Sequence, residues 1–101
     1  MQARARAVRE RYDRLNEEQH GRAWTVEELM LGFVGDVGDL SKLVQGRAGI
    51  RPTADLDAKI AHELADCLWS VFALADSYGI DLEDAFESTM TSIEGHLEGR
   101  E

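Results

Sequence analysis

The sequence has few of the residues that hold small proteins together by covalent bonds or rigid turns. It contains one cysteine and one proline in 101 residues. The single Cys67 excludes an internal disulfide framework and fits a reducing compartment. No run reaches the roughly 20 apolar residues of a membrane span, and the first residues carry arginines without the apolar core of a signal peptide. We therefore expect a cytoplasmic protein that does not insert into membranes.

Positive charge is scarce outside the first 22 residues. That segment holds six basic and four acidic side chains, whereas residues 23–101 hold five basic and sixteen acidic ones. The net charge of the chain is −9. An acidic body repels the backbone of nucleic acids, so we expect no duplex nucleic acid as a partner. The acidity fits either solubility alone or an anionic ligand that arrives with metal cations.

Apolar residues with helical spacing are abundant, and they make up four segments. The pattern predicts a single all-α domain over residues 1–101, in which short connections favour antiparallel neighbours. We expect an N-terminal basic helix over 2–19, two central helices over about 25–45 and 55–78, and a C-terminal helix over about 81–98.

Local signals mark where these helices begin and end. The run "TVEE" reads as a capping box, with Thr25 as N-cap and Glu28 at the third helical position. Gly79 is a suitable residue to end the third helix, with Ile80 as its apolar cap contact. Asp81 is a suitable N-cap for the fourth helix.

The third helix is apolar around most of its circumference, from Leu64 and Leu68 on one side to Trp69 and Phe72 on the other. Such a helix is buried on two sides, which a small monomer cannot easily provide. We therefore expect a homodimer or a dimer of dimers, that is a homotetramer, with the third helix at its centre.

Two pairs of acids flank the apolar stripes of the central helices. In "LGFVGDVGDL", Asp36 and Asp39 lie one turn apart beside the stripe, and Glu63 and Asp66 repeat this spacing on the third helix. If the helices pack through their apolar faces, four carboxylates meet in one cleft, which requires a cation. Mg²⁺ prefers such oxygen ligands. The alternative is that the four acids are ordinary solvated side chains.

Three glycines interrupt the same helix. Gly32 and Gly35 share the acidic stripe, where the lack of a side chain leaves room for a ligand. Gly38 lies elsewhere on the helix, and we expect it to allow close packing of a neighbouring helix. The apolar stripe itself is expected to face the core and consists of Leu29, Phe33, Val37, Leu40 and Val44.

The segments "GDVGDL" and "HELADCLWSVFALADSYGIDLEDAF" resemble the MazG-type nucleotide pyrophosphohydrolases, within the all-α NTP pyrophosphatase superfamily. The resemblance extends over roughly residues 24–90. It implies a MazG-like four-helix bundle and a carboxylate pattern that maps onto Asp36, Asp39, Glu63 and Asp66. By this resemblance the four residues are catalytic and bind Mg²⁺, with Mn²⁺ as an alternative ion.

The activity implied by the resemblance is hydrolysis of a nucleoside triphosphate, NTP or dNTP, to the monophosphate and pyrophosphate, in a role such as housecleaning of the nucleotide pool. Two features depart from the family pattern. Aspartates replace both glutamates of the first pair, and Thr89 and Ile93 stand where relatives often carry lysine and asparagine. The alternative is a non-catalytic module that keeps the fold and binds a nucleotide or a protein.

Two further residues are candidates for substrate binding. Trp24 could stack on a base, although a hydrophobic staple with Leu29 explains it more simply. Lys59 could supply the missing positive charge, although it is also placed for an ion pair with Glu63.

Other residues receive ordinary roles. Arg47 and Arg51 are weaker candidates for the missing charge and are expected to be solvated. His62 is expected to pack in the fold or at an interface, and Cys67 to act as a small buried apolar residue.

Overall fold

Four α-helices make up the computed structural model, which describes residues 1–49 and 55–99. The helices are α1 (Gln2–His20), α2 (Val26–Arg47), α3 (Leu56–Ser77) and α4 (Leu82–Glu98), and the described residues contain no strand. The predicted all-α fold is confirmed, and each predicted boundary lies within two residues of the observed one. None of these described helices has the length and apolar character needed to cross a membrane.

The predicted helix ends are also confirmed. The Glu28 backbone N–H donates to Thr25 Oγ1 (3.2 Å), and the Thr25 N–H donates to Glu28 Oε1 (3.0 Å). At the start of α4, the Asp84 N–H donates to Asp81 Oδ1 (3.1 Å). At the end of α3, Gly79 takes a left-handed conformation with φ of 65°, and the Ile80 N–H donates back to the Ala75 carbonyl (2.9 Å). These local bonds set the lengths of the helices.

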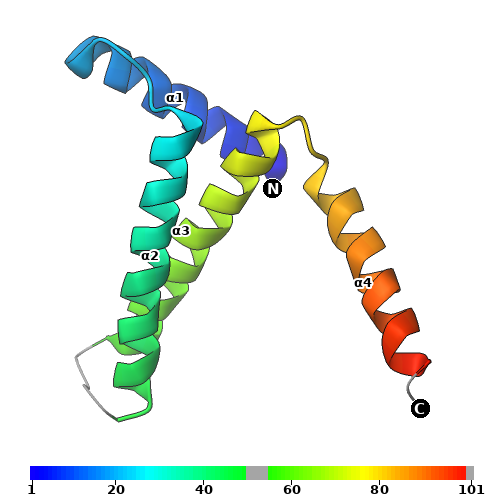
Figure 1. Cartoon of the computed structure of the whole chain (residues 1–101). Helices are drawn as coiled ribbons and strands as arrows, with labels where there is room; N and C mark the ends of the chain where they lie inside the picture. Colours follow the sequence, from blue (N-terminus) through cyan, green and yellow to red (C-terminus); the bar gives the residue numbers. More distant parts are fainter. Residues whose placement is uncertain (50–54, 100–101) are drawn as a thin grey trace.

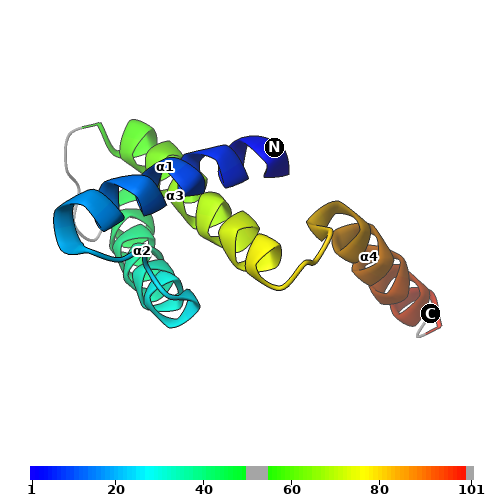
Figure 2. The ribbon, with the colours of Figure 1, turned by 90° about the horizontal axis from the view of Figure 1, so that it is seen from above.

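The first three helices pack into one body. α2 lies along α3, and α1 crosses α3 (Figures 1 and 2). The crossing is fixed by hydrogen bonds from Arg9 Nη1 to the Ala73 carbonyl and from Trp69 Nε1 to the Ala5 carbonyl, both 3.2 Å long. Ala73 is fully buried and Ala5 nearly so. Small residues therefore let α1 approach α3 closely and hold the Tyr12 side of α1 over the body.

α4 stands apart from this body. Its axis diverges from that of α3 in Figure 1, and Figure 2 shows α4 displaced beyond the C-terminal end of α3. Its packing against the other helices is slight compared with that of α2 or α1 on α3. The expected bundle of four helices is therefore not closed within one chain. The radius of gyration is 17.0 Å, whereas a compact domain of this length has about 13 Å.

The side of α2 that faces α3 differs in part from the predicted apolar stripe. Leu29 is buried as expected, but Val37 and Val44 are 45% and 53% exposed. Asp36 and Leu43 are partly covered in their place. The prediction was wrong at these positions because α2 is apolar on a second side as well, so its periodicity does not identify which side meets α3.

Candidate functional site

The structure brings the two acidic pairs together between α2 and α3. One carboxylate oxygen from each of Asp36, Asp39 and Glu63 lies within 4.8 Å of the other two. A second group with the same spacing contains Glu63, Asp66 and a ring nitrogen of His62. Glu63 belongs to both groups, so the four acids and the histidine form one continuous cluster, which we call the acidic cluster.

The carboxylates of the acidic cluster repel one another. The pKa of Asp36 is raised by partial burial and then by the charges of Asp66 and Asp39. The pKa of Glu63 is raised by the same causes, burial first and then the charges of the other three acids. The nearby His62 opposes this rise in both cases, but its effect is the smallest of the causes, so both pKa values remain raised. In both cases the fold disfavours the charged form, and a bound cation would favour it.

The donor set fits a hard divalent cation. Glu63 Oε2 is shielded from solvent and has no hydrogen-bond partner among the described residues, and the four carboxylates form no ion pair with a described lysine or arginine. Carboxylate oxygens at this spacing are what Mg²⁺ or Mn²⁺ accepts. Asp36, Asp39, Glu63 and Asp66 could therefore hold such an ion.

An aromatic cleft adjoins the acidic cluster on the side of α1. Asp36 and Asp66 line it together with the rings of Tyr12, Trp24 and Trp69. The Tyr12 ring stacks on Trp24 with centroids 5.4 Å apart and meets the edge of Trp69 at 5.7 Å. Trp24 is 39% exposed, so part of its ring is open to a ligand.

Sequence reasoning missed two of these rings. Trp69 follows Asp66 by three residues, and this helical spacing places it on the side of α3 that carries the acids. Tyr12 was not singled out, because nothing in the sequence indicated that α1 would cross α3 at this point.

The other end of the acidic cluster is basic. A shallow groove between α2 and α3 is lined by Asp39, Glu63 and His62 and by two lysines, Lys42 and Lys59. The structure contains no ion pair between Lys59 and Glu63, so the sequence-based alternative for Lys59 is not realised. Lys42 was not singled out from the sequence, although its position three residues after Asp39 places it near that carboxylate.

The arginines nearest to this region already have partners. Arg22 Nη2 donates to Glu28 Oε2 (3.1 Å) at the edge of the aromatic cleft. This bond and the Thr25 backbone lower the pKa of Glu28 to about 2. Arg47 pairs with Asp57 at 2.9 Å, and Arg51 lies outside the described residues. The lysines are therefore the better candidates for binding an anion.

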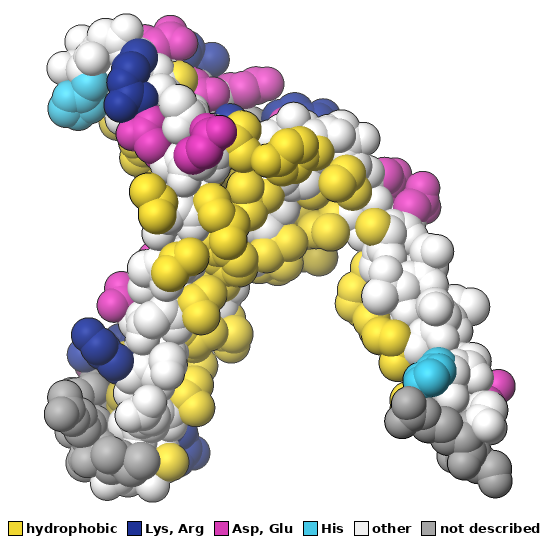
Figure 3. All heavy atoms as spheres, viewed as in Figure 1, with side chains coloured by type: hydrophobic (Ala, Val, Ile, Leu, Met, Phe, Trp, Pro, Cys, Tyr) yellow, Lys and Arg dark blue, Asp and Glu magenta, His cyan; other side chains and the backbone are white. Residues whose placement is uncertain are grey.

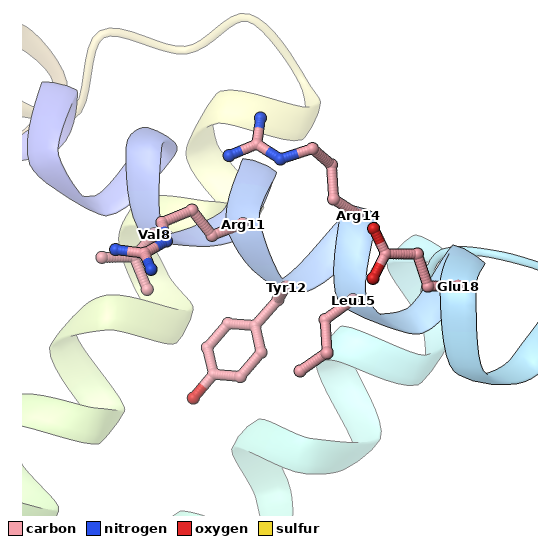
Figure 4. A pocket seen from close by; sticks show the side chains of 6 residues that line it. All are labelled: Val8, Arg11, Tyr12, Arg14, Leu15 and Glu18. Atoms are coloured by element: carbon pink, nitrogen blue, oxygen red, sulfur yellow. The ribbon is translucent and has the colours of Figure 1, made fainter.

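A separate hollow lies on α1, beside the aromatic cleft (Figure 4). It is lined by Val8, Arg11, Tyr12, Arg14, Leu15 and Glu18. Val8 and Tyr12 line both the hollow and the cleft. The hollow contains none of the four clustered carboxylates, so it is not the candidate metal site.

The glycines of α2 face open space. A methyl group built on Gly32, Gly35 or Gly38 would meet no atom within 4 Å, apart from the immediate neighbours and local helix backbone. For Gly32, which lines the aromatic cleft, this agrees with room left for a ligand. For Gly38 the expectation of close helix packing was wrong within one chain, because no neighbouring helix approaches it.

Two other sequence expectations need correction or refinement. His62 does not pack inside the fold: its side chain is 73% exposed, and its Nε2 lies 3.1 Å from Asp66 Oδ2. Cys67 is only partly buried. On α4, neither Thr89 nor Ile93 lines the aromatic cleft or the basic groove, which agrees with the separation of α4 from the body.

Comparison with known proteins places the chain in a family. No curated protein and no solved structure matches it. Residues 24–96, nearly three quarters of the chain, match the MazG nucleotide pyrophosphohydrolase domain. This range contains the whole acidic cluster, Trp24 and both lysines of the basic groove. The chain belongs to the MazG nucleotide pyrophosphohydrolase domain family.

Proposed function

We propose that the protein is a Mg²⁺-dependent nucleoside triphosphate pyrophosphohydrolase, which converts an NTP or dNTP and water to the monophosphate and pyrophosphate. The observation that carries this proposal is the acidic cluster. Four carboxylates from two helices meet there without a lysine or arginine partner among the described residues, and within the same residues one buried oxygen of Glu63 has no hydrogen-bond partner. Such a cluster is unfavourable unless cations and their phosphate ligand occupy it.

The groove between α2 and α3 has a polarity that fits one orientation of the substrate. Its α1 end is aromatic, its centre is acidic, and its other end holds Lys42 and Lys59. A nucleoside triphosphate has the matching order of a flat base, phosphates that bind metal, and a terminal phosphate. We place the base beside Trp24 and the terminal phosphate beside the two lysines.

Each part of the groove then has a role in the reaction. When bound, Mg²⁺ supplies charge neutralisation for the phosphates and the leaving pyrophosphate. Asp36, Asp39, Glu63 and Asp66 hold the cation and orient a water toward phosphorus. The water oxygen forms a bond to phosphorus, the P–O bond that joins the monophosphate to pyrophosphate breaks, and a carboxylate accepts the water proton.

The lysines take over a role that α4 does not fill. α4 contains no lysine or asparagine and does not line the groove within this chain. Lys42 and Lys59 are exposed and carry ammonium groups that can bind phosphate oxygens as point charges. The setting is proposed to be the reducing cytoplasm, in keeping with the free thiol of Cys67.

A second candidate is a module that binds a nucleotide without turnover. The separation of α4 from the groove favours it, because the substrate would then lack contacts from the fourth helix. Its partner would be the same class of ligand, and the acidic cluster would still bind Mg²⁺. Loss of turnover alone, with nucleotide-dependent stabilisation retained, would identify this function.

The experiment that tests the proposal measures pyrophosphate release from a panel of NTPs and dNTPs, with and without Mg²⁺ or Mn²⁺. The wild type is compared with Asp39→Asn and with Glu87→Gln, which changes an exposed acid on α4 and serves as the control. Metal-dependent release by the wild type and the control, but not by Asp39→Asn, supports the enzyme. Absence of release from every nucleotide, together with no Mg²⁺-dependent shift in melting temperature, overturns it.

A further inference from the structure

The salt bridge between Arg22 and Glu28 has a fixed geometry at the edge of the aromatic cleft. Arg22 Nη1 donates to Glu28 Oε1 (2.5 Å) and Arg22 Nη2 donates to Glu28 Oε2 (3.1 Å), so the guanidinium meets the carboxylate end-on with two bonds. Glu28 Oε1 also accepts from the Thr25 N–H (3.0 Å), and Arg22 Nη1 also donates to the Ala23 carbonyl (3.3 Å). These bonds hold both side chains in place at the start of α2.

This salt bridge lies at the end of the groove where the proposed function places the base of the nucleotide. Glu28 lines the aromatic cleft together with Trp24 and Tyr12, and Arg22 precedes Trp24 by two residues. Figure 3 shows basic and acidic side chains next to one another where α1 ends and α2 begins. The side chains of Arg22 and Glu28 are 63% and 37% exposed, so the atoms that the salt bridge leaves free are open to a ligand.

These free atoms form a row of two hydrogen-bond donors and one acceptor. Arg22 keeps its Nε–H and the second N–H of Nη2, which have no acceptor among the described residues. Because the guanidinium is planar, these two N–H groups point the same way and form a second fork. A carboxylate accepts about four hydrogen bonds, and Glu28 uses three, so one position remains on Oε2 beside Arg22 Nη2. The bond from Arg22 is the largest cause that lowers the pKa of Glu28, to about 2, so Oε2 remains an acceptor near neutral pH.

The order donor, donor, acceptor matches some nucleobases and not others. Guanine presents acceptors at N7 and O6 and then a donor at N1 along one edge, and cytosine presents the same order at O2, N3 and N4. Adenine presents an acceptor, a donor and an acceptor at N7, N6 and N1, and uracil and thymine do so at O4, N3 and O2. The central donor of these three bases would meet the Nη2–H of Arg22 and leave both donors without a partner.

We propose that Arg22 and Glu28 select the base of the substrate by binding an edge with two acceptors followed by a donor, as in a guanine or cytosine nucleotide. The inference rests on the proposed function, which places the base beside Trp24. Guanine is the better fit of the two, because it has the larger stacking surface and because an arginine fork on its N7 and O6 is the commonest specific contact to a base. Glu28 then has two tasks, since it caps α2 and contacts the substrate.

The first test measures the dissociation constants of GTP, CTP, ATP and UTP for the wild-type protein by calorimetry in Ca²⁺. We expect GTP or CTP to bind about tenfold more tightly than both ATP and UTP, which is the discrimination that a good bidentate contact to a base provides. Equal dissociation constants for the four nucleotides, or tightest binding of ATP or UTP, overturn the proposal.

Two analogues of GTP distinguish guanine from cytosine as the preferred base. ITP keeps N7, O6 and the N1–H and lacks only the 2-amino group, so it should bind within about twofold of GTP. In 7-deaza-GTP a C–H group replaces the N7 acceptor, so its affinity should be about tenfold lower than that of GTP. If CTP binds most tightly and 7-deaza-GTP binds as well as GTP, cytosine is the base that the row selects. Tightest binding of GTP with no loss for 7-deaza-GTP overturns the proposal.

Two variants test the residues themselves without removing the start of α2. Glu28→Gln retains a capping box, because glutamine serves at the third helical position as glutamate does, but it replaces the carboxylate with an amide. Arg22→Lys retains the positive charge and loses the fork. In each variant the affinities for GTP and ATP, and for CTP and UTP, should come within about twofold of each other. Glu27→Gln, at a neighbouring exposed acid that lines a different hollow, is the matched control and should keep the wild-type ratios.

The ratio of affinities separates a contact to the base from a structural role, because a change in the stability of α2 affects all four nucleotides alike. Melting temperatures are followed in parallel, and wild-type ratios in folded Glu28→Gln and Arg22→Lys overturn the proposal. Selective binding without pyrophosphate release would remove the proposed enzyme and keep this inference. Pyrophosphate release with equal affinities for the four nucleotides would keep the enzyme and remove the inference, and absence of nucleotide binding would remove both.

Discussion

The α2–α3 pair and α4 are all amphipathic helices, but they use their apolar residues in different ways. In the pair, each helix covers part of the other, and the polar residues at the seam are the carboxylates of the acidic cluster. In α4 the apolar face is mostly exposed, and its first turn, at Leu82 and Phe86, lines a cavity together with Leu68 and Phe72 of α3. The difference teaches that a clean apolar stripe predicts a helix well, whereas the partner of that stripe depends on how the helix leaves the preceding turn.

The largest expected effect contrasts an acid of the pair with an acid of α4. Glu63→Gln should lower kcat/KM for a nucleoside triphosphate by about a thousandfold, since charge stabilisation by a bound metal contributes several kcal/mol. Glu87→Gln on α4 should leave kcat/KM within twofold of wild type. Pyrophosphate release under Mg²⁺ measures both, and equal losses in the two variants would contradict the assignment of the site to α2 and α3.

A smaller effect is expected at the basic end of the groove. Lys59→Ala and Lys42→Ala should each raise KM about tenfold, because one charge-assisted hydrogen bond to phosphate contributes roughly 1.5–3 kcal/mol. The corresponding nucleoside diphosphate should lose less affinity than the triphosphate, since it lacks the phosphate that we place beside the lysines. Titration of nucleotide binding by calorimetry in Ca²⁺ separates these affinities from turnover.

Trp24→Ala is the matched variant at the aromatic end. It should lower the binding affinities for the diphosphate and the triphosphate of one nucleoside by the same factor, because it removes a contact to the base. If Lys59→Ala also lowers the binding affinities for the diphosphate and the triphosphate by equal factors, the proposed orientation of the substrate is wrong.

The electrostatic repulsion in the acidic cluster predicts opposite effects on stability and metal response. The folded-state pKa values of Asp36 and Glu63 are raised by burial and neighbouring charge. A carboxyl group whose pKa is higher in the folded than in the unfolded state destabilises the fold as the pH rises through its unfolded and then its folded pKa. The metal-free protein should therefore melt at a higher temperature when one of these acids is neutralised. Asp36→Asn should therefore raise the melting temperature without Mg²⁺.

The same variant should lose the rise in melting temperature that Mg²⁺ causes in the wild type. Differential scanning fluorimetry at pH 7.5, with and without 10 mM Mg²⁺, measures both effects. Asp84→Glu, which retains a charge outside the acidic cluster, should leave the Mg²⁺ response unchanged. A lower metal-free melting temperature for Asp36→Asn would show that Asp36 stabilises the fold in a way that its raised pKa does not describe.

The smallest expected effects distinguish two glycines of α2. Gly38→Ala should stabilise the α2–α3 body by about 1 kcal/mol from helix propensity, since within one chain no atom lies near the added methyl group. Gly32→Ala should stabilise it by the same amount but raise KM, because Gly32 lines the aromatic cleft beside Asp36. Thermal melting and KM together test the pair, and an unchanged KM for Gly32→Ala would place the base elsewhere.

Local features of the sequence predicted most of the secondary structure. The capping box at Thr25, the N-cap at Asp81 and the glycine at position 79 act through bonds to residues within five positions, so their effect can be read from a short segment. The proximity of the four acids could be predicted for a similar reason, because their helical spacing places each pair on one side of its helix, and the two helices are neighbours.

The features that escaped prediction depend on contacts between distant segments. Tyr12 reaches the cleft only because α1 crosses α3, and Trp69 is positioned there by its bond to the Ala5 carbonyl. Val37 is exposed although the apolar stripe predicted its burial. The prediction failed because α2 is apolar on two sides, and the periodicity of the sequence does not indicate which of them faces α3. The turn before α4 is bonded by the side chain of Gln2, which donates to the Ile80 carbonyl and accepts from the Leu82 N–H, and no sequence signal indicated this contact.

The hydrogen bond from the Gln2 side chain to the Ile80 carbonyl joins residues 78 positions apart, and this separation orders events while the chain is being made. The first turn of α1 is synthesised early, but its partner at Ile80 follows only after α2 and α3 are complete. This hydrogen bond at the start of the fourth helix can thus form only late, after the segments that make the acidic groove have been synthesised.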